Sequence, residues 1–392
     1  MTLITPTYQT LLRQVSLPQR TMGRLLPFFE HNLAHTKFLQ DLVTTWVPKV
    51  LITRSLAELN ESTYLEFIEN AMVYYGITGV GQKLFKPLFM SLSPQKFNPK
   101  LFALPFAELV KKHPTMVKHI LPVKAAIIFA SLGVTLLSGE FSFLFLKNMM
   151  TEKLFRKSHF SDVVNLTHRQ LNQQQESPVW KKAKRRLIEC AAVSAGVLAI
   201  STGLTLFGSR LPRLLPALKK MIHWFDFGYK ENGRFALTRP LIRIYMAVSL
   251  MGYLDAARDR LERLEILTRT PMVMLFISSG SEIIEKGLSR FVGKTCPDVL
   301  KHGKIKSIDE IFKTVNPKKF AAVLKAKNTL FYVPLGISIL IPGIGLGLLS
   351  QFWTAYRFKQ QAKEALIKRP PHGPHHPQMQ PFMPIAGTSR TM

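Results

Sequence analysis

The sequence predicts an all-α, helical integral membrane protein with about three membrane-embedded blocks and additional amphipathic helices. Three observations support this class. Long apolar blocks occupy residues 125–146, 190–209 and 328–356, and Glu140 is the only charged residue within them. Basic residues lie on both sides of each block. Helix-start signals recur between the blocks, whereas alternating strand-like runs bounded by tight turns are not evident.

The composition excludes several other classes of protein. The chain has 392 residues, a formal net charge of +29 and 47% hydrophobic residues, which is too apolar for an intrinsically disordered chain. Two cysteines, Cys190 and Cys296, cannot form a disulfide scaffold for a chain of this length. A mean hydropathy of +0.10 disfavours a transporter that is embedded in the membrane throughout. A basic protein with localised apolar blocks remains.

Each of the three blocks is long enough to cross a bilayer, because a spanning helix needs about 20 predominantly apolar residues. The blocks contain 22, 20 and 29 residues in chain order. Three shorter uncharged runs are more typical of helices that pack on or along the embedded part. They occupy residues 70–82, 244–254 and 270–281.

Local signals predict where several helices begin. Ser177-Pro178 combines an N-cap residue with proline at the first helical position, so one helix is expected to run from there to about Gly208. Proline at Pro240 opens a second helix that is expected to reach about Leu267. Thr270-Pro271 is expected to start a third.

The two ends of the chain differ from its middle, which gives three predicted regions. Residues 1–110 form a basic helical region, within which 1–29 reads as a basic arm, with a mitochondrial targeting segment as the alternative. Residues 111–369 form the membrane-embedded region. Residues 370–392 form a disordered tail rich in proline and histidine, whose histidines favour only adventitious metal binding. We expect no cofactor and no metal site.

Flanking charge does not orient the blocks. Four or five Lys and Arg residues stand on each side of every block, so the usual excess on one side is missing. Pro342-Gly343 divides the last block into two halves of about 13 residues, each too short to span alone. The last block is therefore either a kinked spanning helix, which we favour, or a hairpin that enters and leaves on one side.

A few residues within or beside the blocks are candidates for a specific role. Glu140 is a possible intramembrane polar group, although we favour a span that ends near Ser138 with Glu140 at the headgroups. A four-residue spacing of small side chains predicts close helix packing, within the chain or between copies, at Ala191, Ala195, Ala199 and Gly203 and again at Gly343 and Gly347. The charged run from Asp255 to Glu265 is interpreted as a solvated helix face.

The basic flanks predict contact with anionic lipid headgroups, and nucleic acid is disfavoured because no recognised module accompanies them. These flanking residues are Lys181, Lys182, Lys184, Arg185, Arg186, Lys325, Lys327, Arg357 and Lys359. No nucleophile, phosphate-binding or metalloprotease motif is present, so no catalytic residue is predicted.

The sequence therefore predicts a non-enzymatic role in membrane organisation, anchoring or assembly, with homo-oligomer formation through the small-residue stripes left open. A prokaryotic cytoplasmic membrane is favoured over the mitochondrial inner membrane. One alternative is a small transporter or channel that uses Glu140 and the broken helix at Pro342-Gly343. The other is a soluble bundle with the apolar blocks as its core.

Overall fold

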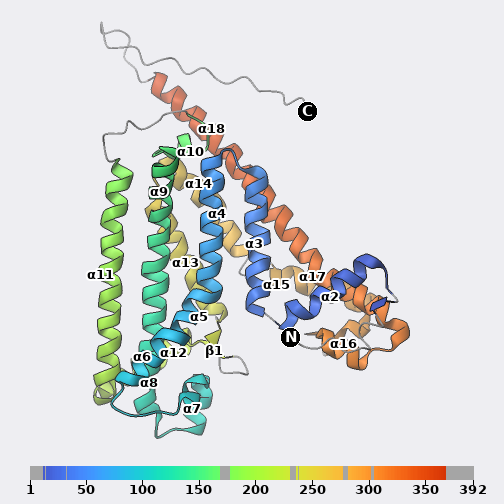
Figure 1. Ribbon diagram of the computed structural model, residues 1–392. Coiled ribbons are helices and arrows are strands. Elements are labelled where there is room, and N and C mark those ends of the chain that lie inside the picture. The colour runs from blue at the N-terminus through green and yellow to red at the C-terminus, as the bar shows by residue number, and fades with distance from the viewer. Residues whose placement is uncertain are drawn as a thin grey trace.

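Long helices form the body of the protein, which agrees with the predicted all-α class (Figure 1). The computed structural model describes residues 12–13, 15–31, 33–167, 177–229, 235–236, 238–276, 281–301 and 304–367. The segment 1–11, which begins the predicted basic arm, and the segment 368–392, which contains the predicted tail, lie outside these residues.

The first half of the described chain contains helices joined by short turns. Its elements are α2 (Leu17–His31), α3 (Leu33–Ile52), α4 (Leu56–Ala71), η1 (Met72–Gly76), α5 (Ile77–Val80), η2 (Gly81–Phe85), α6 (Lys86–Leu92), η3 (Pro99–Ala103), α7 (Phe106–Lys112), α8 (Val117–Ala130), η4 (Ser131–Glu140), α9 (Phe141–Phe155) and α10 (Phe160–Val163). The π-helical turns η1, η2 and η4 continue their neighbouring α-helices without a break.

The second half adds two small strand pairs to its helices. Its elements are α11 (Pro178–Phe207), η5 (Gly208–Arg210), η6 (Pro212–Leu214), α12 (Leu215–Phe225), β1 (Gly228–Tyr229), β2 (Phe235–Ala236), α13 (Arg239–Ala256), α14 (Arg260–Leu275), α15 (Ser281–Thr295), η8 (Pro297–Val299), β3 (Leu300–Lys301), β4 (Lys304–Ile305), α16 (Ile308–Thr314), η9 (Pro317–Lys319), α17 (Phe320–Ser338), η10 (Ile339–Gly345) and α18 (Leu346–Ile367). Both strand pairs are antiparallel.

Three continuous helices are long and apolar enough to cross a membrane, and each contains one predicted block. They cover residues 117–155, 178–210 and 320–364. The three helices differ in burial. In helix 117–155, 78% of the most apolar window is buried inside the protein, whereas the value is 22% in each of the other two helices. The first block therefore forms the core, and the other two expose apolar side chains to the surroundings.

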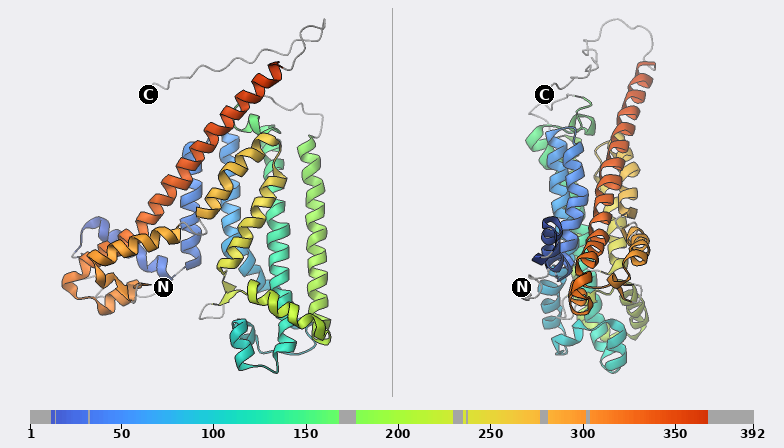
Figure 2. Two further views of the ribbon diagram at one scale, coloured as in Figure 1. Left: turned by 180° about the vertical axis from the view of Figure 1, so that it is seen from behind. Right: turned by 90° about the vertical axis from the view of Figure 1, so that its right-hand side faces the viewer.

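The bundle is built around the continuous helix α8–η4–α9. Helix α11 lies along one side of it, and α4 and α13 lie along others (Figures 1 and 2). Helix α3 packs against α4, and α18 crosses the bundle beside α14. A smaller lobe of α2, α15, α16 and the start of α17 lies beside the bundle and has its own apolar core, which includes Val299, Ile311 and Val323.

Helix α11 begins where the sequence predicted. The Ser177 side chain accepts a hydrogen bond from the Trp180 backbone N–H, and Pro178 occupies the first turn. The face that α11 buries carries Cys190, Val197 and Ser201. Val197 packs closely on Gly133 of η4, where an added Cβ would lie 2.6 Å from a Val197 methyl carbon. The small residue at the contact between α11 and η4 is therefore Gly133 of η4 and not a member of the predicted α11 stripe.

The predicted small-residue stripe of α11 faces away from the rest of the chain. Ala191, Ala195 and Ala199 are exposed, and nothing lies within 4 Å of a Cβ built on Gly203. The stripe therefore packs no helix of the described chain. The second stripe is placed differently, because Gly343 and Gly347 lie against the C-terminal half of α3.

The last block is a kinked helix and not a hairpin. Residues 320–364 form one continuous helix in which η10 carries Pro342, and α18 continues away from α17 instead of turning back (Figure 2). Proline has no backbone N–H to donate, so the helical hydrogen bonding is expected to change around Pro342, and η10 is π-helical there. The kink seats Gly343 against α3, where an added Cβ would lie 3.0 Å from the Thr44 carbonyl oxygen.

Three local predictions were wrong. The expected helix from Pro240 to Leu267 is divided, because α13 ends at Ala256 and Asp259 caps a new helix by accepting a hydrogen bond from the Glu262 N–H. The expected start at Thr270-Pro271 does not occur, since Pro271 lies inside α14. The pairing of β1 with β2 was also missed, although Asn-Gly stands between them in the sequence.

Replacing Gly343 by leucine is expected to lower the melting temperature of the detergent-solubilised protein, because the new side chain would collide with Pro48 and the Thr44 carbonyl. Gly196→Leu on the open face of α11 is the matched control, since an added Cβ there meets nothing within 4 Å. Equal melting temperatures for the two variants would contradict the seating of η10 on α3.

Candidate functional site

A cavity of about 750 Å³ lies in the bundle, and polar and charged side chains stand among its apolar lining. Side chains from α3, α4, α13, α14 and α17 line it, together with the π-helical turns η1 and η10, and the smaller lobe contributes Glu30, Glu285 and Ile305. Along α13 the lining runs from Ile242 to Tyr253, which corresponds to about 16 Å of helix. A cavity of this size falls in the range that holds a small-molecule ligand.

One wall of the cavity is a row of hydroxyl groups on α13. Tyr245, Ser249 and Tyr253 follow one another at intervals of four residues, so they share one face of the helix. Each hydroxyl donates to a carboxylate on another helix. The Tyr245 hydroxyl lies 2.7 Å from Glu140 Oε2 and the Ser249 hydroxyl 3.0 Å from Glu140 Oε1, while Tyr253 donates to Glu69 of α4.

Glu140 lies in the interior of the bundle and not at a helix end. It is 1% exposed, and the helix continues past it to Phe155, so Glu140 is buried among helices, whereas the sequence favoured a headgroup position. Its hydrogen-bond partners are the two α13 hydroxyls behind the cavity wall. Among the described residues, no Lys, Arg or His forms an ion pair with Glu140.

The opposite wall carries groups of both charges. Lys49 of α3 forms an ion pair with Glu66 of α4, and the Tyr74 hydroxyl donates to Asp41. Arg269 of α14 also lines the cavity, as does Glu69. Within the described part of the chain, neither Arg269 nor Glu69 has an ion-pair partner. Burial, with Glu140 and Glu66 nearby, raises the pKa of the Glu69 carboxyl well above its ordinary value. The cavity therefore places in one space a basic and an acidic group that lack ion-pair partners among the described residues.

A buried ion cluster closes the bundle next to the cavity. The Arg258 side chain is fully buried, and its guanidinium binds both carboxylate oxygens of Glu61 at 2.7 and 2.8 Å. It also contacts Glu262 at 3.0 Å, and Lys147 lies 3.1 Å from Glu262. The charged run from Asp255 to Glu265 is thus no solvated face: its inward side ties α14 to α4 and α9.

Burial alone would raise the pKa of the Glu262 carboxyl, but the Arg258 guanidinium and the Lys147 ammonium outweigh it and hold that pKa below its ordinary value. A carboxyl with a depressed pKa stabilises the folded state above its ordinary pKa of 4.5, and this contribution is lost as the pH falls below that value.

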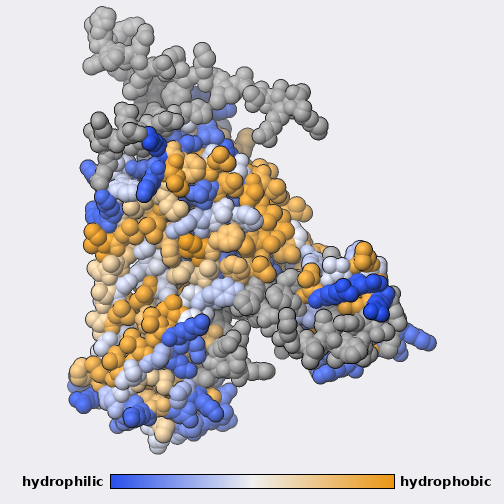
Figure 3. All heavy atoms as spheres, viewed as in Figure 1, coloured by the Kyte–Doolittle hydropathy of each residue, from blue (hydrophilic) through white to orange (hydrophobic). Residues whose placement is uncertain are grey.

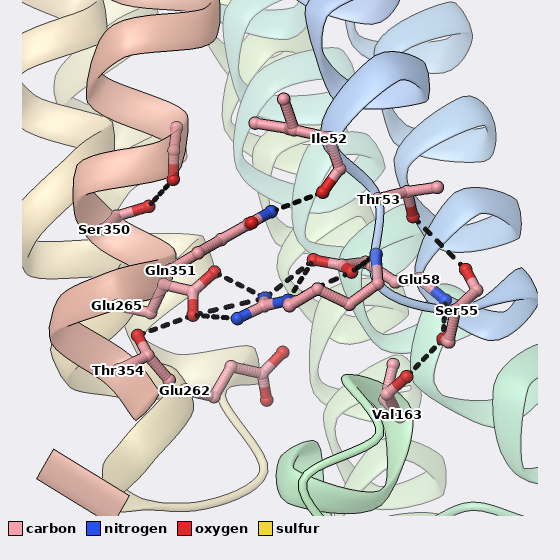
Figure 4. Close-up of polar contacts among 12 residues, drawn as sticks. Ile52, Thr53, Ser55, Glu58, Val163, Glu262, Glu265, Ser350, Gln351 and Thr354 are labelled. Carbon is pink, nitrogen blue, oxygen red and sulfur yellow. Dashed lines mark hydrogen bonds and ion pairs between the residues drawn. The ribbon is translucent and has the colours of Figure 1, made fainter. Parts of the chain in front are cut away.

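A second cluster joins the cavity to the first half of α18. The Arg54 guanidinium lies 2.6 Å from Glu58 and 2.9 Å from Glu265, which lines the cavity. Glu265 also accepts a hydrogen bond from Thr354. Figure 4 shows Thr354 and Gln351 of α18 converging with Glu265 on the turn that carries Ile52 and Thr53. The first cluster therefore connects α4, α9 and α14, and the second connects the turn between α3 and α4 with α14 and α18.

The predicted basic flanks take three different environments. Lys182 and Arg186 form ion pairs with Asp255, and Lys327 pairs with Glu30. Arg357 stacks over the Trp353 ring at 4.6 Å. Lys184 likewise lies over the Trp180 ring, and Arg185 pairs with Glu189. Lys181, Lys325 and Lys359 are exposed.

Sequence reasoning singled out Pro342 and Gly343, which line the cavity, and Glu140, which lies behind its wall, but it did not predict the cavity itself. The four-residue spacing of Tyr245, Ser249 and Tyr253 within an otherwise apolar run was the signal that could have found one wall. The carboxylates on α3 and α4 gave no comparable signal, because acidic residues on a helix ordinarily face water.

No family model, curated protein or solved structure matches this chain. The site is therefore interpreted from its own geometry.

Replacing Arg258 by methionine is expected to destabilise the protein by about 3–5 kcal/mol, because Glu61 and Glu262 would remain buried without their main counter-charge. Arg263→Met, an exposed position one turn further along α14, is the matched control. Denaturant unfolding in detergent measures the free energy of unfolding of both variants. An equal decrease in the Arg263→Met control would show that the buried ion cluster has no special stabilising role.

Proposed function

We propose that this chain is an integral membrane protein that binds a small zwitterionic solute in its polar cavity and carries it into or across the bilayer. The observation that carries the proposal is a cavity with ionisable walls inside a bundle whose outer helices are apolar. Neither half of this observation is sufficient alone, since water-soluble proteins have polar cavities and simple anchors have apolar surfaces.

The outer surface supports a membrane location. On α18 and its lead-in, Leu340, Leu349 and Phe352 are 58–71% exposed, and on α11 Ile200 is 55% exposed. Figure 3 shows apolar side chains over the middle of the bundle and hydrophilic ones toward both ends. Arg357 lies over the Trp353 ring near the middle of α18, and aromatic and basic residues of this kind are typical of the boundary between lipid and water. A soluble bundle would leave these apolar surfaces in water.

The chemistry of the cavity supports a solute with both charges. Arg269 can bind a carboxylate, and Glu69 with the neighbouring tyrosines can bind an ammonium group. Charged groups at this depth are costly unless they have a partner, and in membrane proteins they mark solute and ion sites. Pro342 and Gly343 line the same cavity, so the kinked helix also contributes to it.

Membrane organisation or anchoring through self-association is the second candidate. The outward stripe of Ala191, Ala195 and Ala199 favours it, since a second copy can approach closely there. Both candidates are non-enzymatic, and both place the basic flanks at anionic headgroups. The prokaryotic cytoplasmic membrane is the proposed location. The two candidates differ in one respect: an anchor has no need of a cavity that water can enter.

Cysteines placed at Ser338 and Leu340 are expected to differ in reactivity toward a charged, membrane-impermeant methanethiosulfonate in sealed vesicles. Ser338 lines the cavity, whereas Leu340, two residues further along, is 64% exposed on the outer surface. In a background without Cys190 and Cys296, the cysteine at 338 should react from one side of the vesicle and the cysteine at 340 should be protected by lipid. Protection of both would favour the anchor, and equal reaction of both would contradict a membrane location.

A further inference from the structure

A second, smaller pocket lies between the start of α2 and α17. Its volume is about 260 Å³, and it is separate from the cavity described above. Lys325, Asn328, Thr329 and Tyr332 of α17 line one side, and Gln19 of α2 lines the other. The α17 residues recur at intervals of three and four, so they lie on one helix face.

The pocket contains a buried side chain without a partner. Asn328 is 7% exposed, yet both its amide nitrogen and its amide oxygen lack a hydrogen-bond partner in the structure. The Tyr332 hydroxyl is also buried without a partner. A buried polar group without a hydrogen bond destabilises the protein, so a polar ligand that reached these atoms would remove that cost.

The charge of the pocket specifies the ligand. Lys325 contributes an ammonium group at its edge, and among the described residues no carboxylate forms an ion pair with it. No acidic side chain lines the pocket. An ammonium, two side-chain amides and a phenol offer several hydrogen-bond donors to one anion, and the amide oxygens can accept from a hydroxyl.

The position of the pocket points to a lipid source. Asn328 is the first residue of the uncharged block 328–356, whereas Lys325 and Lys327 directly precede it. The pocket therefore lies where the charged lobe meets the predicted membrane-embedded helix, at the depth of lipid headgroups. This step rests on the proposed membrane location, whereas the anion-binding chemistry does not.

We propose that this pocket binds the phosphate and glycerol hydroxyls of an anionic phospholipid headgroup. Lys325 contacts the phosphate, and Asn328 and Tyr332 satisfy their hydrogen bonds on the headgroup oxygens. Basic pockets beside membrane-embedded helices recognise anionic headgroups by the same chemistry. The lobe of α2, α15 and α16 is then fixed to the membrane surface through α17.

The experiment compares the melting temperature of the full-length protein in detergent with added phosphatidylglycerol or phosphatidylcholine. Phosphatidylglycerol should raise the melting temperature of the wild-type protein by several degrees more than phosphatidylcholine does. Lys325→Gln and Asn328→Leu should abolish the difference, and Lys318→Gln, an exposed lysine of the same lobe, should retain it. Asn328→Leu removes unpaired buried atoms and is expected to fold at least as well as the wild type.

A further arm replaces the lipid with glycerol 3-phosphate. Stabilisation by this compound at millimolar concentration, lost in the same two variants, would retain the anion site but assign it to a soluble phosphate ester and remove the lipid assignment. Equal shifts in all variants, or no preference for phosphatidylglycerol, would overturn the proposal. The methanethiosulfonate experiment above tests the membrane location separately, so the two failures are distinguishable.

Discussion

The fold depends on neutralising charges that are buried inside an apolar bundle. Arg258 is the centre of this constraint, because its guanidinium contacts carboxylates from α4 and α14 while Lys147 of α9 approaches the same two groups. Separating these helices would leave charges in an environment that cannot solvate them. The cluster therefore fixes the spacing of the helices, and the cavity is the space that this spacing leaves.

The position of the cavity follows from which helix occupies the centre. Because 78% of the most apolar window of α8–η4–α9 is buried, this helix is the centre around which α4, α11 and α13 pack. Helix α13 presents its hydroxyls to Glu140 on one side and to the cavity on the other. The kink at Pro342 allows the last helix to close the cavity with Gly343 and then to leave the bundle along α14.

The sequence was sufficient to predict what local chemistry controls. Three apolar blocks, the capped start at Ser177 and the kink at Pro342 all follow from composition, capping and backbone restriction. The role of the Asp255–Glu265 run was not predictable in this way. Oppositely charged residues four apart have the same sequence pattern whether that helix face is exposed to water or buried against other helices. The direction of the α11 stripe was likewise unpredictable, because small residues permit close packing without specifying the partner.

The central claim is that apolar side chains of α11 face lipid while a cavity inside the bundle carries polar and charged side chains. Nitroxide labels at consecutive α11 positions in reconstituted vesicles test it, through their collisions with oxygen, which partitions into lipid, and with a water-soluble nickel complex. The account predicts that labels at Val193 and Ile200, both exposed, collide with oxygen and not with nickel, and that a label at the buried Val197 collides with neither. Strong nickel collisions at Val193 and Ile200 would place this face in water and contradict the account.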